Sequence, residues 1–492
     1  MSIINKINNL RKKICFKHDS LEEKTINLSS IFFLFLWIIN PSNKIALLFF
    51  LVFLYCLFRL TKKLDISLII VFFLSSFFSI GKTYFIQLLD LKQFPDLMNL
   101  YPIGLVTKVQ ISISDVLFSF LVVYLILINY KKRINFKKIA LIDIILIIFF
   151  IYGIFADFFI STNIYLSFLL KKDLFEFIFI YFVIRFFIQN QSLLFRLFFA
   201  SLIVLTFFEV FIVLQQYIYS SPIGKSVEAT FNIEHFGGLP DEQSFIFRPI
   251  GTFIHTNVLA MFFASIFPFL TFLIIKSKKY SFKIIFFTTI ACLILTLSRV
   301  AWLISLISFI FIVTYFKYHK KSISLKNISF RKNYFFIILS IPLFLYSFPR
   351  IIQTFNTFQE GGGLNLRVKQ INEVLNLITQ SPFFGVGTGM SVVKAIEKVP
   401  HGVFAGFPSE IHVYPLLIAV ENGLPYLAFF VIFLFYSFKK LIRYKKNLPL
   451  ISFFGLLSMM VIGLFQPFII NNLLFILLAF DYDKISEDSY AY

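Results

Sequence analysis

Cysteine and charged residues are both scarce in this sequence. Its three cysteines, Cys15, Cys56 and Cys292, are widely spaced and form no CxxC pair. We therefore expect neither a disulfide framework nor a cysteine metal site. Charged residues make up 14% of the 492 residues, whereas hydrophobic residues make up 59%. No soluble core could absorb so much apolar sequence, so the composition predicts a membrane protein.

Acidic residues are the rarer of the two charge types. The chain has 25 Asp and Glu against 46 Lys and Arg, which gives a net charge of +21. In a soluble protein this balance would suggest nucleic-acid binding. Here most basic residues lie in short clusters between apolar runs, which is typical of cytoplasmic loops. We therefore predict contact with membrane lipids and no nucleic-acid partner.

Tryptophan is nearly absent, whereas phenylalanine is abundant. The sequence has 2 Trp and 73 Phe. We interpret the phenylalanines as general apolar filler and expect most of them to face lipid.

Apolar runs divide the chain into candidate membrane spans. A helix needs roughly 20 apolar residues to cross a bilayer, or fewer when it is short or kinked, and about fourteen segments qualify. They cover approximately residues 30–40, 44–60, 64–80, 111–130, 139–156, 174–188, 193–217, 253–275, 284–297, 300–316, 334–348, 413–438, 448–465 and 468–480. The sequence therefore predicts an all-α polytopic membrane protein with about 12–14 transmembrane helices.

With the N terminus inside, strict alternation of the spans places five basic clusters in the cytoplasm, as the positive-inside rule requires. The resulting parts are a cytoplasmic tail at 1–29, an N-terminal transmembrane bundle at 30–217, an external loop at 218–250, transmembrane helices at 251–348, a large external loop at 349–411, C-terminal transmembrane helices at 412–480 and a cytoplasmic tail at 481–492. We predict a multi-pass protein of the inner (plasma) membrane with both termini in the cytoplasm.

One basic pair does not follow this pattern. Lys171 and Lys172 fall on the outer side, next to Asp173 and Glu176. Either these lysines reach the interface and pair locally, or they belong to a site for an anionic substrate.

The second external loop contains a segment with helical periodicity at residues 364–379. Its apolar stripe consists of Leu364, Val368, Ile371, Val374, Leu375 and Ile378. This pattern predicts an amphipathic helix at the membrane surface.

Unusual polar residues cluster at the outer ends of the later spans. Arg248 opens the run RPIGTFIHTNVLA, which also contains His255 and Asn257, and Arg299 lies in the Ser-Arg break of LTLSRVAWL. Arg367 lies on the polar face of the expected surface helix. Arginine binds phosphate bidentately and stays charged. We predict that the three arginines bind an anionic group and that His255 and Asn257 support them; the alternative is that they are ordinary interfacial residues.

His412 and Glu421 belong to the run HVYPLLIAVENGLPYLAFF. His412 lies at the outer mouth of a predicted span, where it could act as a general base toward a sugar hydroxyl or bind a phosphate. Glu421 is followed by Asn422 and Gly423, which more often indicates a helix break than a catalytic carboxylate. We therefore treat Glu421 as a supporting residue.

Signals for metal and nucleotide binding are missing. No His, Cys or Asp group has metal-ligand spacing, and no DxD-type pair lies on the outside. The glycine-rich segment 381–389, SPFFGVGTG, lacks the GxGxxG spacing of a dinucleotide site and reads better as a tight external turn. We expect metal-independent chemistry without a cofactor.

The motifs described above, and their order along the chain, resemble those of the O-antigen ligase and O-antigen polymerase superfamily of membrane glycosyltransferases. The resemblance covers roughly residues 248–438. The matching features are Arg248, Gly251 and Asn257; the turn with Thr296, Ser298 and Arg299; the outer loop with Arg367, Pro382 and Gly385 to Gly387; and His412 followed by Glu-Asn-Gly.

The resemblance implies a GT-C-like architecture and an inverting glycosyltransferase. The donor would be an undecaprenyl-diphosphate-linked oligosaccharide, and the acceptor a growing polysaccharide or a lipid core, at the outer face of the membrane. Arg248, Arg299 and Arg367 would bind the diphosphate, with Arg299 also catalytic, and His412 would position or deprotonate the acceptor hydroxyl. Other polysaccharide export proteins are possible partners.

Two other functions stay open. A protein O-oligosaccharyltransferase would share these residues. A transporter or flippase of an anionic or lipid-linked solute is the alternative of another class. It is disfavoured because the sequence shows no related halves and places its arginines at the outer rim.

Overall fold

The computed structural model describes residues 21–78, 80–87, 106–129, 139–161, 164–228, 247–277, 279–319, 363–406, 411–444, 446–466 and 472–485. The first half contains α2 (Leu21–Ile39), α3 (Asn43–Thr61), α4 (Leu64–Ser75), β1 (Gly81–Gln87), β2 (Val106–Ser112), α6 (Ile113–Asn129), α7 (Leu141–Ile160), α8 (Ile164–Phe182), a π-helical turn (Val183–Phe187) and α9 (Gln191–Tyr219). The second half contains α10 (Thr256–Lys276), α11 (Tyr280–Leu295), α12 (Arg299–His319), α14 (Gly363–Gln380), α15 (Ser391–Lys398), α16 (Val403–Gly406), α17 (Tyr414–Asn422), α18 (Leu424–Arg443), α19 (Asn447–Gly463), α20 (Asn472–Ala479) and a 3-10 turn (Tyr482–Lys484).

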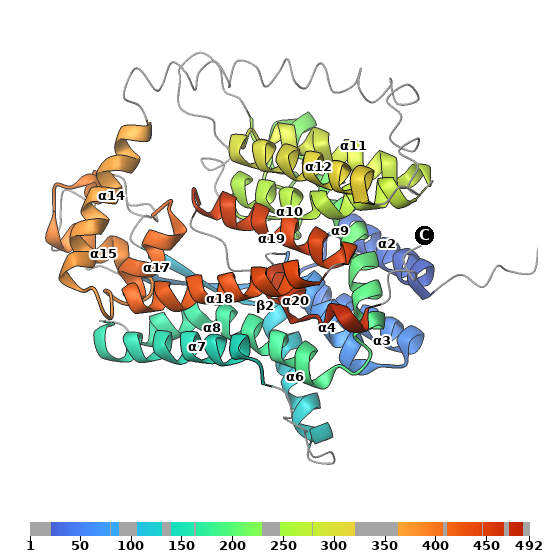
Figure 1. Ribbon diagram of the computed structural model, residues 1–492, viewed down its shortest axis with the longest axis horizontal. Helices are drawn as coiled ribbons and strands as arrows, with labels where there is room; N and C mark the ends of the chain where they lie inside the picture. Colours follow the sequence, from blue (N-terminus) through green and yellow to red (C-terminus); the bar gives the residue numbers. More distant parts are fainter. Residues whose placement is uncertain are drawn as a thin grey trace, which may run out of the picture.

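Most of these helices lie side by side in one bundle (Figure 1). Within the described residues, six helices are long and apolar enough to cross a membrane, namely α3, α7, α9, α10, α12 and α18, and four shorter apolar helices accompany them. The fold is therefore that of an all-α polytopic membrane protein, as predicted. The span expected at 334–348 lies outside the described residues, and the count of 12–14 transmembrane helices stays a prediction.

Helix α10 lies at the centre of the bundle. It packs against α11, α12 and α19, and nearly all of its membrane-length window is buried inside the protein. Gly455 of α19 allows the closest approach, because a Cβ atom there would lie 2.7 Å from the carbonyl oxygen of Ser265. The neighbouring α9 is also largely buried and packs against α2, α4 and α11. These two helices form the rigid base for the segment that carries Arg248.

Phenylalanine fills the core, which contradicts the expectation that most of it faces lipid. Among the described residues, buried phenylalanines outnumber exposed ones. Many of them pack ring against ring; Phe32 and Phe53, for example, stack with their centroids 4.4 Å apart. A flat, rigid ring fills space between helices at little cost in side-chain entropy, and paired rings gain additional stability. Composition alone does not distinguish this use from lipid exposure.

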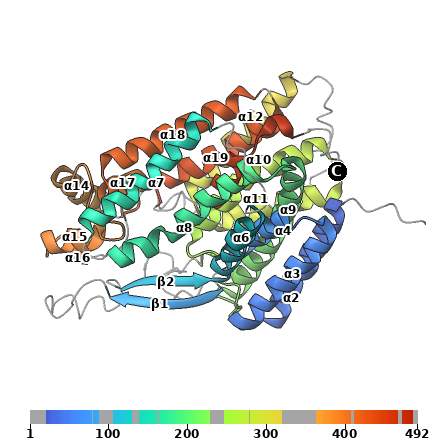
Figure 2. The ribbon, with the colours of Figure 1, turned by 90° about the horizontal axis from the view of Figure 1, so that it is seen from below.

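A β-hairpin, which the sequence did not predict, joins α4 to α6. Strands β1 and β2 pair antiparallel, from Gly81 opposite Ser112 to Gln87 opposite Val106. Gly81 permits this pairing because a Cβ atom there would lie 2.3 Å from the carbonyl oxygen of Ile111. The hairpin extends toward the end of the molecule where α14, α15 and α16 lie (Figure 2). We refer to this end, with α14 to α17, as the capped end.

The predicted span at 413–438 is two helices instead of one. Helix α17 ends at Asn422, α18 begins at Leu424, and Gly423 between them has a φ of 90°. Pro425 in the first turn of α18 is tolerated because amides at a helix start need no intrahelical partner. The Leu424 amide donates to the Pro382 carbonyl oxygen at 2.7 Å. The glycine-rich segment 381–389 therefore packs directly on the helix break.

The expected surface helix is present as α14. Val374 and Ile378 of the predicted stripe are buried, together with Leu377, whereas Val368 and Leu375 of that stripe are exposed, as are Arg367 and Lys369. These buried residues join a small cluster of their own with residues of α15, α16 and α17. The capped end thus has a hydrophobic core of its own, which is smaller than that of the main bundle.

Candidate functional site

Arg248 is held in the segment that leads into α10. Its Nε and Nη2 atoms donate to the Thr296 carbonyl oxygen at 3.1 and 2.9 Å, and Nη2 also donates to Asn257 Oδ1 at 3.2 Å. The segment before α10 is thereby joined to the turn between α11 and α12. Arg299, which starts α12, is exposed three residues after Thr296. The structure thus places Arg248 and Arg299 around the same turn.

Two buried side chains of α9 fix the backbone next to Arg248. Gln216 Oε1 accepts from the amides of Ile250 and Gly251 at 3.1 and 2.8 Å, and its Nε2 donates to the Gly251 carbonyl oxygen at 3.0 Å. Glu209 accepts from both the hydroxyl and the amide of Thr252. Sequence reasoning missed both residues, although a buried Glu and a buried Gln within a long apolar helix are a signal that polar partners lie nearby.

His255 has a structural role at the start of α10. Its Nδ1 atom accepts from the Asn257 amide at 3.0 Å, so the imidazole caps the helix. Asn257 in turn accepts from Arg248. The two predicted supporting residues therefore order the Arg248 segment.

Arg367 and His412 interact at the capped end. His412 lies in the loop before α17, outside the membrane-spanning helices, and is half-buried. Burial and then the positive charge of Arg367 lower the pKa of His412 to about 4. The imidazole is therefore neutral at pH 7. Its Nδ1 atom is buried and has no hydrogen-bond partner within the described part of the chain, so the ring carries an unsatisfied polar atom there.

Glu421 lies in the last turn of α17, beside the helix break. Its Oε1 atom accepts from the Ser391 hydroxyl at 2.9 Å, and its carbonyl oxygen accepts from the Gly387 amide, also at 2.9 Å. The Val386 amide donates to the Val420 carbonyl oxygen at 2.8 Å. These two amides of the glycine-rich segment thus satisfy the open end of α17, which is their main role in this structure.

A buried ion pair that the sequence did not predict lies below this segment. Lys171 Nζ is 2.7 Å from Asp157 Oδ2, and it also donates to the carbonyl oxygen of Gly153 and, at 2.6 Å, to Asn422 Oδ1. Lys171 belongs to α8 and Asp157 to α7. The position of Lys171 on the outer side of the predicted topology indicated that this lysine is unusual. Its partner could not be predicted, because Asp157 is brought to it by the packing of α7 against α8.

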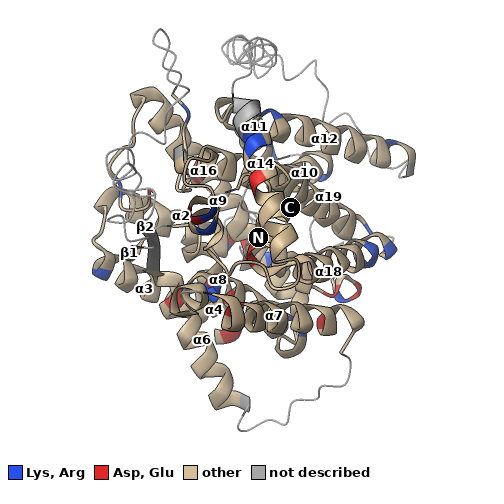
Figure 3. Cartoon of the chain, turned by 90° about the vertical axis from the view of Figure 1, so that its left-hand side faces the viewer, with Lys and Arg blue, Asp and Glu red and all other residues tan. Residues whose placement is uncertain are grey.

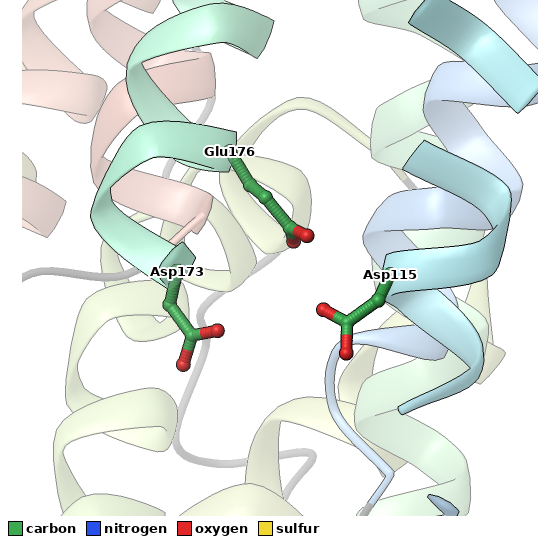
Figure 4. A group of neighbouring side chains, drawn as sticks. All are labelled: Asp115, Asp173 and Glu176. Atoms are coloured by element: carbon green, nitrogen blue, oxygen red, sulfur yellow. The ribbon is translucent and has the colours of Figure 1, made fainter. Parts of the chain in front are cut away.

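The other lysine of the pair, Lys172, contacts two members of a group of three acids. Asp173 and Glu176 on α8 face Asp115 on α6 (Figure 4), with oxygen atoms within 4.8 Å of one another. Lys172 Nζ lies 2.7 Å from Asp115 and 3.5 Å from Asp173. These carboxylates could hold a metal ion, which sequence spacing did not reveal because the helices come from distant segments. Lys172 already supplies a positive charge between Asp115 and Asp173, so the close approach of these carboxylates does not by itself indicate a metal site.

Charged side chains are unevenly distributed when the molecule is seen from the capped end. Most of the chain in this view consists of uncharged residues, while acidic and basic residues lie next to each other near α6, α7 and α8 (Figure 3). The contacts described above thus gather the predicted residues in two groups. One, at the start of α10, contains Arg248, His255 and Asn257 beside the turn before Arg299. The other, at the capped end, contains Arg367, His412 and, near the break, Glu421.

Comparison with protein families identifies a domain in the second half of the chain. Residues 284–431 match the family model described as O-antigen ligase. The match includes Arg299, Arg367, His412 and Glu421 and begins after Arg248. A search of curated proteins gives no match. The O-antigen ligase domain at residues 284–431, on an all-α polytopic membrane fold, supports an O-antigen ligase-like family for this chain.

Proposed function

We propose that the chain transfers a glycan from an undecaprenyl-diphosphate carrier to an acceptor, a growing polysaccharide or a lipid core, at the outer face of the inner membrane. The observation that carries the proposal is the O-antigen ligase match, because this family implies a glycosyltransferase-like enzyme that uses a lipid-linked glycan. The matched segment contains Arg299, Arg367 and His412, which we assign to donor and acceptor, whereas Arg248 precedes it.

The arginines are assigned to the diphosphate. A diphosphate gains charge as it leaves the sugar, and fixed cations near it stabilise the transition state more than the ground state. Arg299 is exposed at the start of α12 and Arg367 is exposed on α14, so both can meet a ligand from outside. Arg248 is placed beside the same turn as Arg299 by its bonds to Thr296.

His412 is assigned to the acceptor hydroxyl. The hydroxyl oxygen would form a bond to the anomeric carbon from the side opposite the diphosphate, the bond between that carbon and the phosphate oxygen would break, and the diphosphate would keep the electron pair. The proton would pass to His412, whose imidazole is neutral and whose Nδ1 accepts no hydrogen bond within the described residues. A single displacement of this kind inverts the anomeric configuration and needs no metal ion.

The test uses purified protein in detergent with extracted undecaprenyl-diphosphate oligosaccharide and acceptor membranes. We expect wild type to extend or transfer the glycan and to release the lipid diphosphate, and we expect Arg299→Ala and His412→Ala to lose both products. If wild type releases no lipid diphosphate with native acceptor membranes, the proposal is wrong. If a protein is glycosylated instead of a glycan or lipid, the acceptor assignment is wrong.

A further inference from the structure

Four segments of the chain meet at the break between α17 and α18. Helix α7 contributes Asp157, α8 contributes Lys171, the glycine-rich segment contributes Thr388, and the end of α17 contributes Asn422. The first two belong to the N-terminal half, outside residues 284–431, and the last two belong to the matched domain. The junction therefore joins the domain to a part of the chain that the family match does not cover.

The hydrogen bonds at this junction form a closed network. Lys171 Nζ contacts Asp157 Oδ2 at 2.7 Å and Asn422 Oδ1 at 2.6 Å. Asn422 Oδ1 also accepts from the Thr388 hydroxyl at 3.2 Å, and the Thr388 amide donates to Asp157 Oδ1 at 2.9 Å. Each of the four residues thus contacts at least two of the others. The Lys171 and Asp157 side chains are only 7% and 1% exposed, so water does not compete for these bonds.

The network fixes the residues on both sides of Glu421. Asn422 follows it directly, and the Gly387 amide, next to Thr388, donates to its carbonyl oxygen. The two backbones pack closely there, because a Cβ atom on Gly385 would lie 2.4 Å from the Glu421 carbonyl carbon. Helix α17 has nine residues and leads back to His412. A shift at the break would therefore be transmitted to both ends of α17.

A buried ion pair is a poor device for stability alone. Removing two charges from water costs about as much as their attraction returns, and well-packed apolar residues of similar size are often at least as stable. What the pair does provide is a single geometry, since Lys171 on α8 satisfies a carboxylate and a carbonyl oxygen of α7 and the side-chain amide of Asn422 on α17 at once. We therefore interpret this pair as a contact that fixes how these segments are oriented relative to one another.

We infer that Lys171 and Asp157 are positioning residues for the transfer reaction. They hold the glycine-rich segment against the break, and so set the orientation of Glu421 and of His412 at the far end of α17. The inference rests on the proposed function for its kinetic consequence, but its structural consequence can be measured independently.

A second buried pair between the same parts of the chain provides a matched control. Arg185, in the π-helical turn that follows α8, lies 2.7 Å from Asp143 near the start of α7, at the opposite end of these helices. Its side chains are 16% and 0% exposed. Lys171→Met with Asp157→Asn removes one pair, and Arg185→Met with Asp143→Asn removes the other. Each double variant avoids leaving a lone buried charge, so both are expected to fold.

The kinetic readout is kcat and the KM for the undecaprenyl-diphosphate oligosaccharide. We expect the Lys171/Asp157 double variant to lose about 10- to 100-fold in kcat, as displaced catalytic groups do, with little change in donor KM. The Arg185/Asp143 double variant should keep the wild-type kcat. An equal loss of kcat in both variants would mean that the Lys171 pair is merely structural and would overturn the inference.

The structural readout is hydrogen exchange of the peptide that covers residues 381–389. Loss of the network should speed the exchange of the Val386 and Gly387 amides in the Lys171/Asp157 variant and leave it unchanged in the control variant. Unchanged exchange in the first variant would overturn the inference even if activity fell. Faster exchange there, with no transfer by wild-type protein, would show that the network holds the glycine-rich segment but would reject the proposed function, and with it the role in transfer.

Discussion

His412 is the residue whose chemistry depends most on its surroundings. Burial and the Arg367 charge lower its pKa to about 4, so the imidazole is unprotonated at pH 7 but is a weak base. A diphosphate bound to Arg367 would add negative charge and offset one of the two causes. In the proposed reaction, donor binding would therefore strengthen His412 as a base at the moment when the hydroxyl must be deprotonated.

This relation predicts a pH dependence. Protonated His412 cannot accept a proton, so kcat/KM of wild type should fall only as the pH drops through about 4. Arg367→Gln removes the cationic cause but leaves burial, the larger one, so the acid limb should move to higher pH without reaching the value of a solvated histidine. The measurement is kcat/KM against pH for both proteins. An acid limb that stays in place in Arg367→Gln would contradict the interaction.

Several of these residues could be named from the sequence, but their contacts could not. Arg367 and His412 are 45 positions apart, and only the packing of α14 near α17 brings their charges together. The sequence assigns His255 a supporting role at the site, which stays a prediction; the contact that the structure shows is a helix cap. Asp157 lies in the apolar sequence of α7, which indicates a polar partner nearby, but the sequence does not show that this partner is Lys171 of α8.

At the scale of elements, the break at Gly423 controls the capped end. Gly423 adopts a φ of 90°, and a Cβ atom there would lie 1.8 Å from the Phe383 carbonyl oxygen. A side chain therefore both strains the backbone and pushes the glycine-rich segment away. This position needs glycine for two separate reasons.

Gly423→Ala should consequently lower stability and activity together. With φ 90° and ψ 166°, Gly423 lies in a region that is nearly exclusive to glycine and costs another residue about 1–3 kcal/mol, and the overlap with Phe383 adds to it. Gly455→Ala, in the core contact between α19 and α10, provides a comparison with overlap but no positive φ. Thermal unfolding in detergent and transfer rate are measured for both. Wild-type activity in Gly423→Ala would show that the break does not affect the site.

The hydrogen bonds from Gln216 of α9 to the backbone of Ile250 and Gly251, which we call the α9 clamp, lead to a second prediction about the elements. Gln216→Leu leaves the amides of Ile250 and Gly251 without their acceptor, which costs about 1–3 kcal/mol for each buried group, and it frees the segment that carries Arg248. We expect a lower melting temperature and a higher donor KM. Gln215→Leu is the matched control, because the adjacent Gln215 forms none of these bonds. Equal effects of the two substitutions would argue against the clamp.

Periodicity predicted some elements well and others not at all. The surface helix expected at 364–379 is observed as Gly363–Gln380, because its apolar stripe packs against α15 to α17. The span expected at 413–438 is broken, since hydropathy records apolar character and not the backbone angle of Gly423. The hairpin β1–β2 was missed because its strands pair across a long connection and sit beside apolar spans.

At the scale of the whole molecule, the proposed reaction requires the capped end to face outward. We expect a cysteine at the exposed Lys398 of α15 to be labelled in intact cells by a membrane-impermeant maleimide, and a cysteine at the exposed Lys439 of α18 to be labelled only after lysis. The twenty residues of α18 span about 30 Å, the thickness of the hydrocarbon core, which separates the two positions by one crossing. The opposite labelling pattern would place the arginines and His412 in the cytoplasm.

The central claim, that the protein breaks the bond between glycan and carrier, is tested most directly in proteoliposomes. Purified protein is reconstituted with undecaprenyl-diphosphate oligosaccharide that carries a label on its sugar, and an acceptor is supplied on one side. We expect labelled acceptor and free undecaprenyl diphosphate, and we expect both products to be lost in His412→Ala. Movement of the intact lipid-linked sugar across the bilayer, with no cleavage, would contradict it and identify a flippase.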